Sequence, residues 1–206
     1  MAKYTMEMVL EYAKIFPENA DMGSPDGPKA AKAIHDKGGQ YIVNAYFTSE
    51  DQIEQLLKDG MNPAPMNSPR VIEGNAEFGI GKFMKLKRPV PDNIKTFENK
   101  NGPVEINYGG PVGVVNLTNF SRPDNWDFMS DSEKSKAIAE ATFDKGWWSI
   151  QEDGLIGNGT KAMVQFEMYA DGSGLRPVNI GITDHVSYEG NNSNYDASAN
   201  EMFKVA

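Results

Sequence analysis

The chain has 206 residues, and its 20 basic and 29 acidic side chains give a net charge of −9 and a pI near 4.8. This length allows one domain with a full hydrophobic core, and the absence of cysteine excludes disulfides, thiolate catalysis and Cys-based zinc sites. No apolar run approaches membrane-spanning length, and the N-terminal residues lack the apolar core of a signal peptide, so we expect a cytoplasmic protein.

The N-terminal part of the chain predicts strands separated by turn-rich loops. Alternating apolar residues indicate strands, and a serine before an acidic first turn indicates the start of a helix. The expected elements are a strand over 6–16, a loop over 17–39 with a helical turn at 29–35, a strand over 40–47, and a helix over 50–58 capped by Ser49. The side chains of the second strand expected in the core are Tyr41, Val43, Ala45 and Phe47, and those expected to face outward are Asn44 and Tyr46.

The middle of the chain predicts one strand, a stretch of loops and one helix. Three prolines exclude regular structure in residues 61–70. The expected elements are a strand over 78–88 that bends at Gly79 and Gly81, a short strand over 112–117, and a helix over 130–145 capped by Ser130. The strand's inward residues are Ile80, Met84 and Leu86, and its outward residues are Phe83, Lys85 and Lys87.

The segment 155–188 predicts a β-hairpin with one core face and one wet face. Residues 171–174 (DGSG) supply the turn, because Asp and Gly tolerate the positive φ of tight hairpins. The core face is expected to hold Ala162, Val164, Phe166, Met168, Val178, Ile180 and Ile182. The wet face of the first strand is expected to hold Lys161, Met163, Gln165, Glu167 and Tyr169.

These elements together predict a mainly β fold with short helices. About five strands, a helix between the middle strands and a closing hairpin describe an OB-fold-like, five-stranded Greek-key barrel with a helical insertion. We expect a single domain over residues 1–189, in which 120–150 form a helical elaboration, and a flexible C-terminal tail over 190–206.

No motif predicts an enzyme, a cofactor or a metal. The two histidines, His35 and His185, are isolated in the sequence, and no metal-ligand spacing or nucleophile motif is present. Residues 157–161 (GNGTK) lack the spacing of a phosphate loop and open a strand instead of a helix. We therefore expect a protein that is not an enzyme and that needs no cofactor.

A basic stretch interrupts the acidic chain. Residues 61–120 are the only net positive segment, and 82–88 (KFMKLKR) contain four basic side chains with no acid between Glu77 and Asp92. Basic and aromatic residues on strand faces suit a groove for a nucleic-acid strand, where lysines follow phosphates and aromatics stack on bases. A merely solvated strand face is the alternative. The residues expected on the wet faces are Tyr46, Phe83, Lys85, Lys87, Arg88, Lys161 and Tyr169.

Four segments resemble, in order, the single-stranded DNA-binding proteins of tailed phages of the podovirus type. They are YAKIFPENAD (12–21) with GGQYIVNAYFTSEDQIEQLL (38–57), KFMKLKRP (82–89), NGPVEINYGG leading into PVGVVNLTN (101–119), and IGNGTKAMVQFEMYADGSG (156–174). The resemblance implies an OB-fold protein that coats single-stranded DNA without base specificity during phage DNA replication, recombination and repair. The DNA-binding residues that it implies are Lys14, Phe16, Tyr46, Lys82, Phe83, Lys85, Lys87, Arg88, Lys161 and Tyr169.

The implied partners are single-stranded DNA and replication proteins such as a polymerase, helicase or nuclease. Those proteins would contact the C-terminal tail or the segment 120–150, although the tail is only weakly acidic and Phe203 is not terminal. The segment 120–150 would otherwise cover a core edge or shield the groove. The sequence does not decide between a monomer and a homodimer. The competing function is a non-enzymatic phage structural protein, such as a virion accessory β-barrel. A third alternative, a barrel that binds a small ligand, is not favoured, because the sequence shows no convergent set of polar residues.

Overall fold

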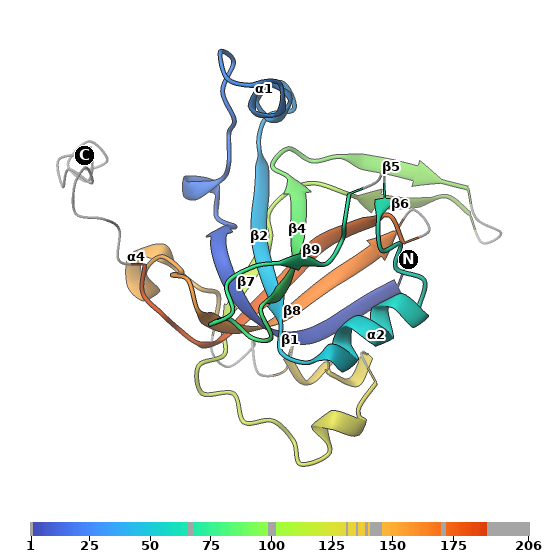
Figure 1. The fold of residues 1–206 in the computed structure, drawn as a ribbon, viewed down its shortest axis with the longest axis vertical. Helices are drawn as coiled ribbons and strands as arrows, with labels where there is room; N and C mark the ends of the chain where they lie inside the picture. The colour runs from blue at the N-terminus through green and yellow to red at the C-terminus, as the bar shows by residue number, and fades with distance from the viewer. Residues whose placement is uncertain are drawn as a thin grey trace.

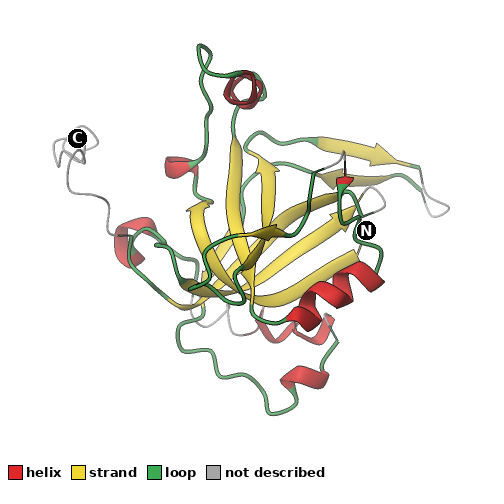
Figure 2. Cartoon of the chain, in the orientation of Figure 1, coloured by secondary structure: helices red, strands yellow, loops and turns green. Residues whose placement is uncertain are grey.

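The computed structural model describes residues 2–65, 68–98, 102–130, 132–134, 136–138, 140, 146–169 and 172–188 (Figure 1). It is mainly β with short helices (Figure 2). The strands are β1 (Ala2–Lys14), β2 (Gln40–Phe47), β3 (Ile72–Glu73), β4 (Lys82–Pro89), β5 (Ile94–Phe97), β6 (Val104–Asn107), β7 (Gly113–Asn116), β8 (Thr160–Tyr169) and β9 (Gly174–Asp184). The helices are α1 (Lys29–His35), α2 (Glu50–Lys58) and α4 (Ile150–Asp153), with 3-10 turns at Pro17–Asn19 and Trp126–Phe128.

Seven strands form one curved sheet in the order β3-β4-β2-β1-β8-β9-β7. All neighbours are antiparallel except β7 and β9. The sheet is open, since no ladder joins β4 to β9 among the described residues. A side chain spans this gap instead, because Arg88 Nη1 on β4 donates to the carbonyl of Pro177 on β9 at 3.2 Å. The hairpin of β5 and β6 pairs separately and extends away from the sheet (Figure 1).

The core lies on the concave side of the sheet. Alternate residues of β1, β2, β4 and β8 point there, as the period of a strand requires. Helix α2 closes one end with Ile53 and Leu56, and its cap is held where Gln52 Oε1 accepts from the Ser49 amide at 3.3 Å. The predicted bounds of this helix and of β2 are confirmed. Fully buried side chains of the core include Met8, Leu10, Val43, Phe47, Leu86, Phe166, Ile180 and Ile182.

Two strand predictions need correction. The first strand runs from Ala2 to Lys14 instead of 6–16. The strand expected over 78–88 begins only at Lys82, because residues 78–81 turn tightly. Gly79 has φ +53°, and a Cβ on it would lie 2.0 Å from the Phe47 carbonyl oxygen, so the chain needs glycine at this turn.

The hairpin of β8 and β9 has the expected core face, but its opposite face is not uniformly wet. Met163 and Glu167 on that face are buried. In the ladder, Asn179 lies opposite Gln165 and Pro177 lies opposite Phe166, so Val178 has no pairing partner on β8. Val178 is therefore half-buried instead of in the core. One of the expected turn residues, 171, lies outside the described residues, as does the predicted tail over 190–206.

The helix expected over 130–145 is described in part. Residues 132–134, 136–138 and 140 are helical, and Ser130 Oγ accepts from the Glu133 amide at 3.3 Å, as the predicted cap requires. The remaining positions lie outside the described residues. Within the part of the chain that the structure describes, no helix is long and apolar enough to cross a membrane.

Candidate nucleic-acid interface

The convex face of β1, β2 and β4 is organised as three rows of side chains across the strands. Ladder partners place these residues side by side. From the end of the face nearest α1, the rows are Lys14-Ile42-Lys87, then Glu11-Asn44-Lys85, then Val9-Tyr46-Phe83. The predicted outward direction of Phe83, Lys85 and Lys87 is therefore confirmed, since all three lie on this face.

The third row is covered. Val9, Tyr46 and Phe83 form a small apolar cluster beneath Ile72 and Phe78. The Tyr46 hydroxyl donates to Glu11 Oε2 at 3.1 Å and accepts from the Asn75 amide at 3.0 Å. Because Tyr46 is 1% exposed and Phe83 8%, the expectation that their rings are open for stacking on bases is wrong for this structure. Segment 71–81 packs over both rings.

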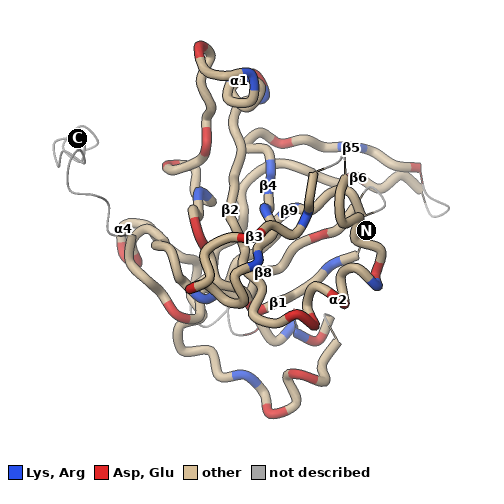
Figure 3. The backbone as a smooth tube through the Cα atoms, viewed as in Figure 1, with Lys and Arg blue, Asp and Glu red and all other residues tan. Residues whose placement is uncertain are grey.

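The first two rows stay open and carry a cluster of positive charge. Lys14 and Lys87 are exposed and Lys85 is half-exposed, and Figure 3 shows basic residues along β4. Partial burial lowers the pKa of Lys87 below its ordinary value, and the charges of Lys85 and Arg70 lower it further, while Asp21 acts in the opposite direction. We call Lys14, Arg70, Lys85 and Lys87 the basic cluster.

The basic cluster lacks carboxylate partners. None of its members forms an ion pair within the described ranges of the chain. The Glu11 carboxylate beside Lys85 instead accepts from Asn44 Nδ2 and from Tyr46. Like charges that are partly buried without counterions destabilise each other, and a phosphate between them would relieve that repulsion.

Arg70 joins the cluster from the proline-rich loop. Its Nη2 donates to the carbonyl of Ser173, which ties the loop to the turn between β8 and β9. Its Nε is buried and has no hydrogen-bond partner among the described residues. Burial lowers the pKa of Arg70, and the nearby Tyr169 partly opposes that shift. The guanidinium therefore has unused hydrogen-bonding capacity beside the turn.

Tyr169 connects the basic cluster to an aromatic run. Together with Lys87, Arg88 and residues of α1, it lines a cavity of about 370 Å³. Its ring lies 5.3 Å from that of Tyr108, which lies 6.3 Å from Phe97 on the β5–β6 hairpin. Lys95 Nζ lies 5.4 Å from the centre of the Tyr108 ring. Aromatic and basic groups thus continue from β4 onto the hairpin.

The Tyr108 ring rests on a buried ion pair. The Arg176 guanidinium lies 4.4 Å from the centre of that ring and donates to the carbonyl of Asn107 at 2.7 Å. Arg176 Nε also donates to Glu167 Oε2 on β8 at 2.8 Å. Both side chains are buried. The pair fixes the base of the hairpin against the main sheet.

The other predicted DNA-binding residues have different surroundings. Phe16 lies in the core, so its expected position in a groove is wrong. Arg88 donates to the carbonyls of Gly109, Gly110 and Pro177 and points toward β9. Two lysines are held by carboxylates: Lys82 by Glu50 at 2.6 Å, at the far end of β4, and Lys161 by Asp184 at 3.0 Å.

The structure brings in residues that the sequence reasoning missed. Arg70 lies in a loop without periodicity, and Tyr108 and Lys95 belong to a region expected as loops and short strands. Ile42 separates Lys14 from Lys87 on the convex face. Only contacts between segments that are distant in the sequence place these side chains together. The local signal that was available was the aromatic and basic composition of 95–108.

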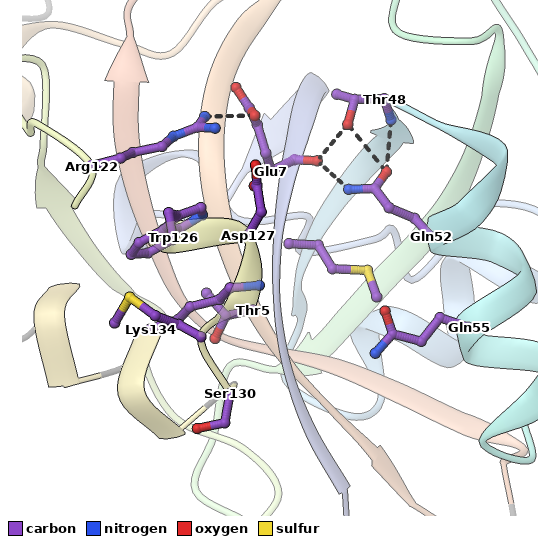
Figure 4. A pocket seen from close by; sticks show the side chains of 12 residues that line it. Thr5, Glu7, Thr48, Gln52, Gln55, Arg122, Trp126, Asp127, Ser130 and Lys134 are labelled. Atoms are coloured by element: carbon purple, nitrogen blue, oxygen red, sulfur yellow. Dashed lines mark hydrogen bonds and ion pairs between the residues drawn. The ribbon is translucent and has the colours of Figure 1, made fainter. Parts of the chain in front are cut away.

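A second hollow lies over the first half of β1 (Figure 4). It has a volume of about 420 Å³ between β1, α2 and the segment 122–134. Arg122 pairs with Glu7 at 2.6 Å, and Gln52 Nε2 donates to the Glu7 carbonyl at 2.9 Å. Trp126 is buried, and this segment lies against β1, an interior strand of the sheet. The basic cluster lies on another part of the convex face.

Comparisons with known proteins give little beyond this geometry. No family model and no curated protein sequence matches the chain. Among solved structures, it is similar to the crystal structure of gp2.5, a single-stranded DNA-binding protein encoded by bacteriophage T7, with 13% identity and a TM-score of 0.44. The match covers 95% of this chain and 99% of that chain. At this identity and TM-score, the likeness assigns neither a family nor a function.

Proposed function

We propose that this protein binds single-stranded DNA without base specificity, through the basic cluster and Tyr169, in phage DNA replication, recombination and repair. The observation that carries the proposal is a group of neighbouring cations, unpaired among the described residues, on an open strand face. Lysine and arginine on such a face follow phosphates, and each phosphate contact releases counterions from the strand. Tyr169 supplies an aromatic ring, which stacks on any base.

The order of the strands supports the same proposal. Taking the β4–β9 contact as a closure, the strands follow one another as β1-β2-β4-β9-β8, which is the order of an OB barrel. OB barrels bind oligonucleotides on the face of their second and third strands, between the loop after the first strand and the loop between the last two. The corresponding parts here are the convex face of β2 and β4, the segment containing α1, and the turn next to Tyr169.

The competing proposal is a structural or interaction protein. Three exposed apolar side chains on the β5–β6 hairpin favour it: Ile94, Phe97 and Val104. Such a protein forms a stable oligomer and does not select single strands. Replication partners that bind through 120–150 or the tail, and a homodimer, are compatible with the DNA-binding proposal.

The test is a fluorescence-anisotropy titration of a labelled oligo-dT at several salt concentrations, with a matched duplex as competitor. We expect tight, salt-sensitive binding that the duplex does not displace. The double variant Lys85→Ala/Lys87→Ala removes two contacts, which lowers the magnitude of the log-log salt slope by about 1.4, at about 0.7 per contact on a single strand.

The matched control is Lys58→Ala/Lys136→Ala, which removes the same charge from α2 and from the segment after Ser130. We expect the control to keep the salt slope of the unmodified protein. No binding by the unmodified protein at low salt would reject the proposed function. Equal slopes for the two double variants would remove the basic cluster from the interface.

A further inference from the structure

Tyr12 has a backbone conformation that tyrosine rarely adopts. Its φ is +50°, and it is the one non-glycine residue with positive φ in the described part of the chain. It lies in a β-bulge, where the pairing of β1 with β2 shifts between Glu11 and Lys14. Bulges that need a left-handed residue normally use glycine, because a bulky side chain is strained there.

The contacts of Tyr12 do not explain why the strain is kept. Its side chain is 63% exposed, so the ring contributes little to the core. The hydrogen bond at this position runs from the Tyr12 backbone amide to Asn158 Oδ1 at 2.9 Å. Glycine would make the same bond without strain. Strain that packing does not require is concentrated at functional sites.

The Tyr12 ring borders a hollow of about 350 Å³ at the end of the convex face. Leu155 and Ile156 provide its apolar wall, and Tyr188, which is 56% exposed, also lines it. Lys14 lines it as well, and the same residue begins the row that crosses Ile42 to Lys87. Two exposed rings, an aliphatic wall and an ammonium group match a nucleobase with its phosphate.

We propose that this hollow holds one base of the bound strand, stacked on Tyr12, with Lys14 on the adjacent phosphate. The strand then crosses Ile42 and Lys87 toward Tyr169. This inference rests on the proposed function and adds a second stacking position at the opposite end of the basic cluster. The strained backbone is kept because it aims the Tyr12 ring along the strand's path.

The test uses variants that separate binding from folding. Tyr12→Gly relieves the strain and Tyr12→Asn tolerates the same backbone, and both remove the ring. We expect both to weaken oligo-dT binding about 5- to 150-fold, the loss of one stacked base, with the salt slope unchanged. We expect Tyr12→Gly to raise the urea midpoint of unfolding. Tyr12→Phe keeps the ring and should keep both affinity and stability.

Two results would overturn the inference while leaving the proposed function in place. One is unchanged affinity of Tyr12→Gly and Tyr12→Asn when the unmodified protein binds oligo-dT. The other is a lower urea midpoint for Tyr12→Gly, which would make the ring a structural element. Failure of the unmodified protein to bind is a separate result, because it rejects the proposed function itself.

A direct measurement complements the variants. An oligo-dT that carries 5-iodo-deoxyuridine is crosslinked to the protein by ultraviolet light, and the attachment sites are mapped by mass spectrometry. We expect crosslinks at Tyr12 or Tyr188 in addition to Tyr169. Crosslinks confined to Tyr169 and the β5–β6 hairpin would place the strand away from this hollow and overturn the inference.

Discussion

At the scale of single residues, the charge state of Lys87 couples binding to pH. In the free protein, partial burial lowers the pKa of Lys87, and the charge of Lys85 lowers it further. The charge of Asp21 acts in the opposite direction. A bound phosphate raises that pKa again, so the charged lysine favours the complex. Affinity from this contact is therefore complete below the pKa of the free protein and is lost as pH rises above it.

The first prediction is that, as pH rises, binding to oligo-dC begins to weaken at a lower pH than it would if Lys87 had the ordinary pKa of a lysine. Oligo-dC is used because cytosine does not lose a proton in the alkaline range. The control is Lys87→Arg, whose guanidinium stays charged, and its affinity should not fall over the same pH range. Identical pH profiles for the two proteins would show that Lys87 does not contact a phosphate.

The same shift has the opposite sign for folding. The unfolded chain holds the Lys87 proton more tightly than the folded chain does, so the stability of the fold rises with pH across this range. The second prediction is that Lys87→Met raises the urea midpoint of unfolding at neutral pH while it weakens DNA binding. A lower midpoint would mean that the ammonium group is stabilised by its surroundings.

Tyr169 carries the third prediction. Its ring is half-exposed and meets Tyr108 at 5.3 Å with an interplanar angle of 71°. Tyr169→Ala should weaken oligo-dT binding by about 1–3 kcal/mol, the cost of one lost stacking position, with little effect on the salt slope. Tyr169→Phe is the control and should bind as the unmodified protein does. Unaltered affinity of Tyr169→Ala would assign the ring to packing against Tyr108.

At the scale of elements, Arg88 joins two strands that no ladder joins. Its guanidinium donates to the carbonyls of Gly109, Gly110 and Pro177. The fourth prediction is that Arg88→Ala lowers the free energy of unfolding by about 2–4 kcal/mol, because hydrogen bonds from a charged donor contribute about 1.5–3 kcal/mol each and are partly replaced by water. Urea denaturation measures this loss.

Arg88→Lys separates charge from geometry in that contact. Lysine keeps the positive charge but lacks the planar set of donors that reaches several carbonyls at once. We expect its stability to lie between those of the unmodified protein and Arg88→Ala. A full loss of DNA affinity in Arg88→Lys with unchanged stability would contradict the structural role and return Arg88 to the interface.

The elements that local periodicity specifies were predictable from the sequence, and those that depend on distant contacts were not. The bounds of β2 and α2 and the core face of β8 follow from alternation and capping in short segments. The burial of Tyr46 and Phe83 depends instead on segment 71–81, which folds over them and ends in the glycine turn before β4. The unusual backbone of Tyr12 depends on pairing with β2 and on Asn158, and no local pattern indicates it.

The candidate site divides in the same way. Alternation predicts Lys85 and Lys87 on one face and places Arg88 on the other, so the prediction that groups Arg88 with them is wrong. Arg70, Tyr108 and Tyr12 come from a loop, a hairpin end and a bulge. Composition can suggest that such residues bind nucleic acid, but only the tertiary fold places Arg70 near Lys87, Tyr108 against Tyr169, and Tyr12 beside Lys14.

At the scale of the whole molecule, a net charge of −9 opposes the local attraction of the basic cluster. The two effects act over different distances. Contacts with phosphates act at short range through counterion release, whereas the repulsion between the acidic protein and DNA acts over the Debye length. That length is about 30 Å at 0.01 M salt and about 8 Å at 0.15 M.

The fifth prediction follows from this difference in range. Below about 0.05 M salt the repulsion is weakly screened, so the plot of log affinity against log salt should flatten there and become steeper at higher salt. The variant Asp51→Asn/Glu54→Gln removes two exposed acids of α2. It should bind oligo-dT more tightly at 0.01 M salt and equally at 0.3 M. A gain of affinity that persists at 0.3 M would mean that these acids lie on the path of the DNA strand. A straight plot of log affinity against log salt for the unmodified protein would show that the net charge has no part in binding.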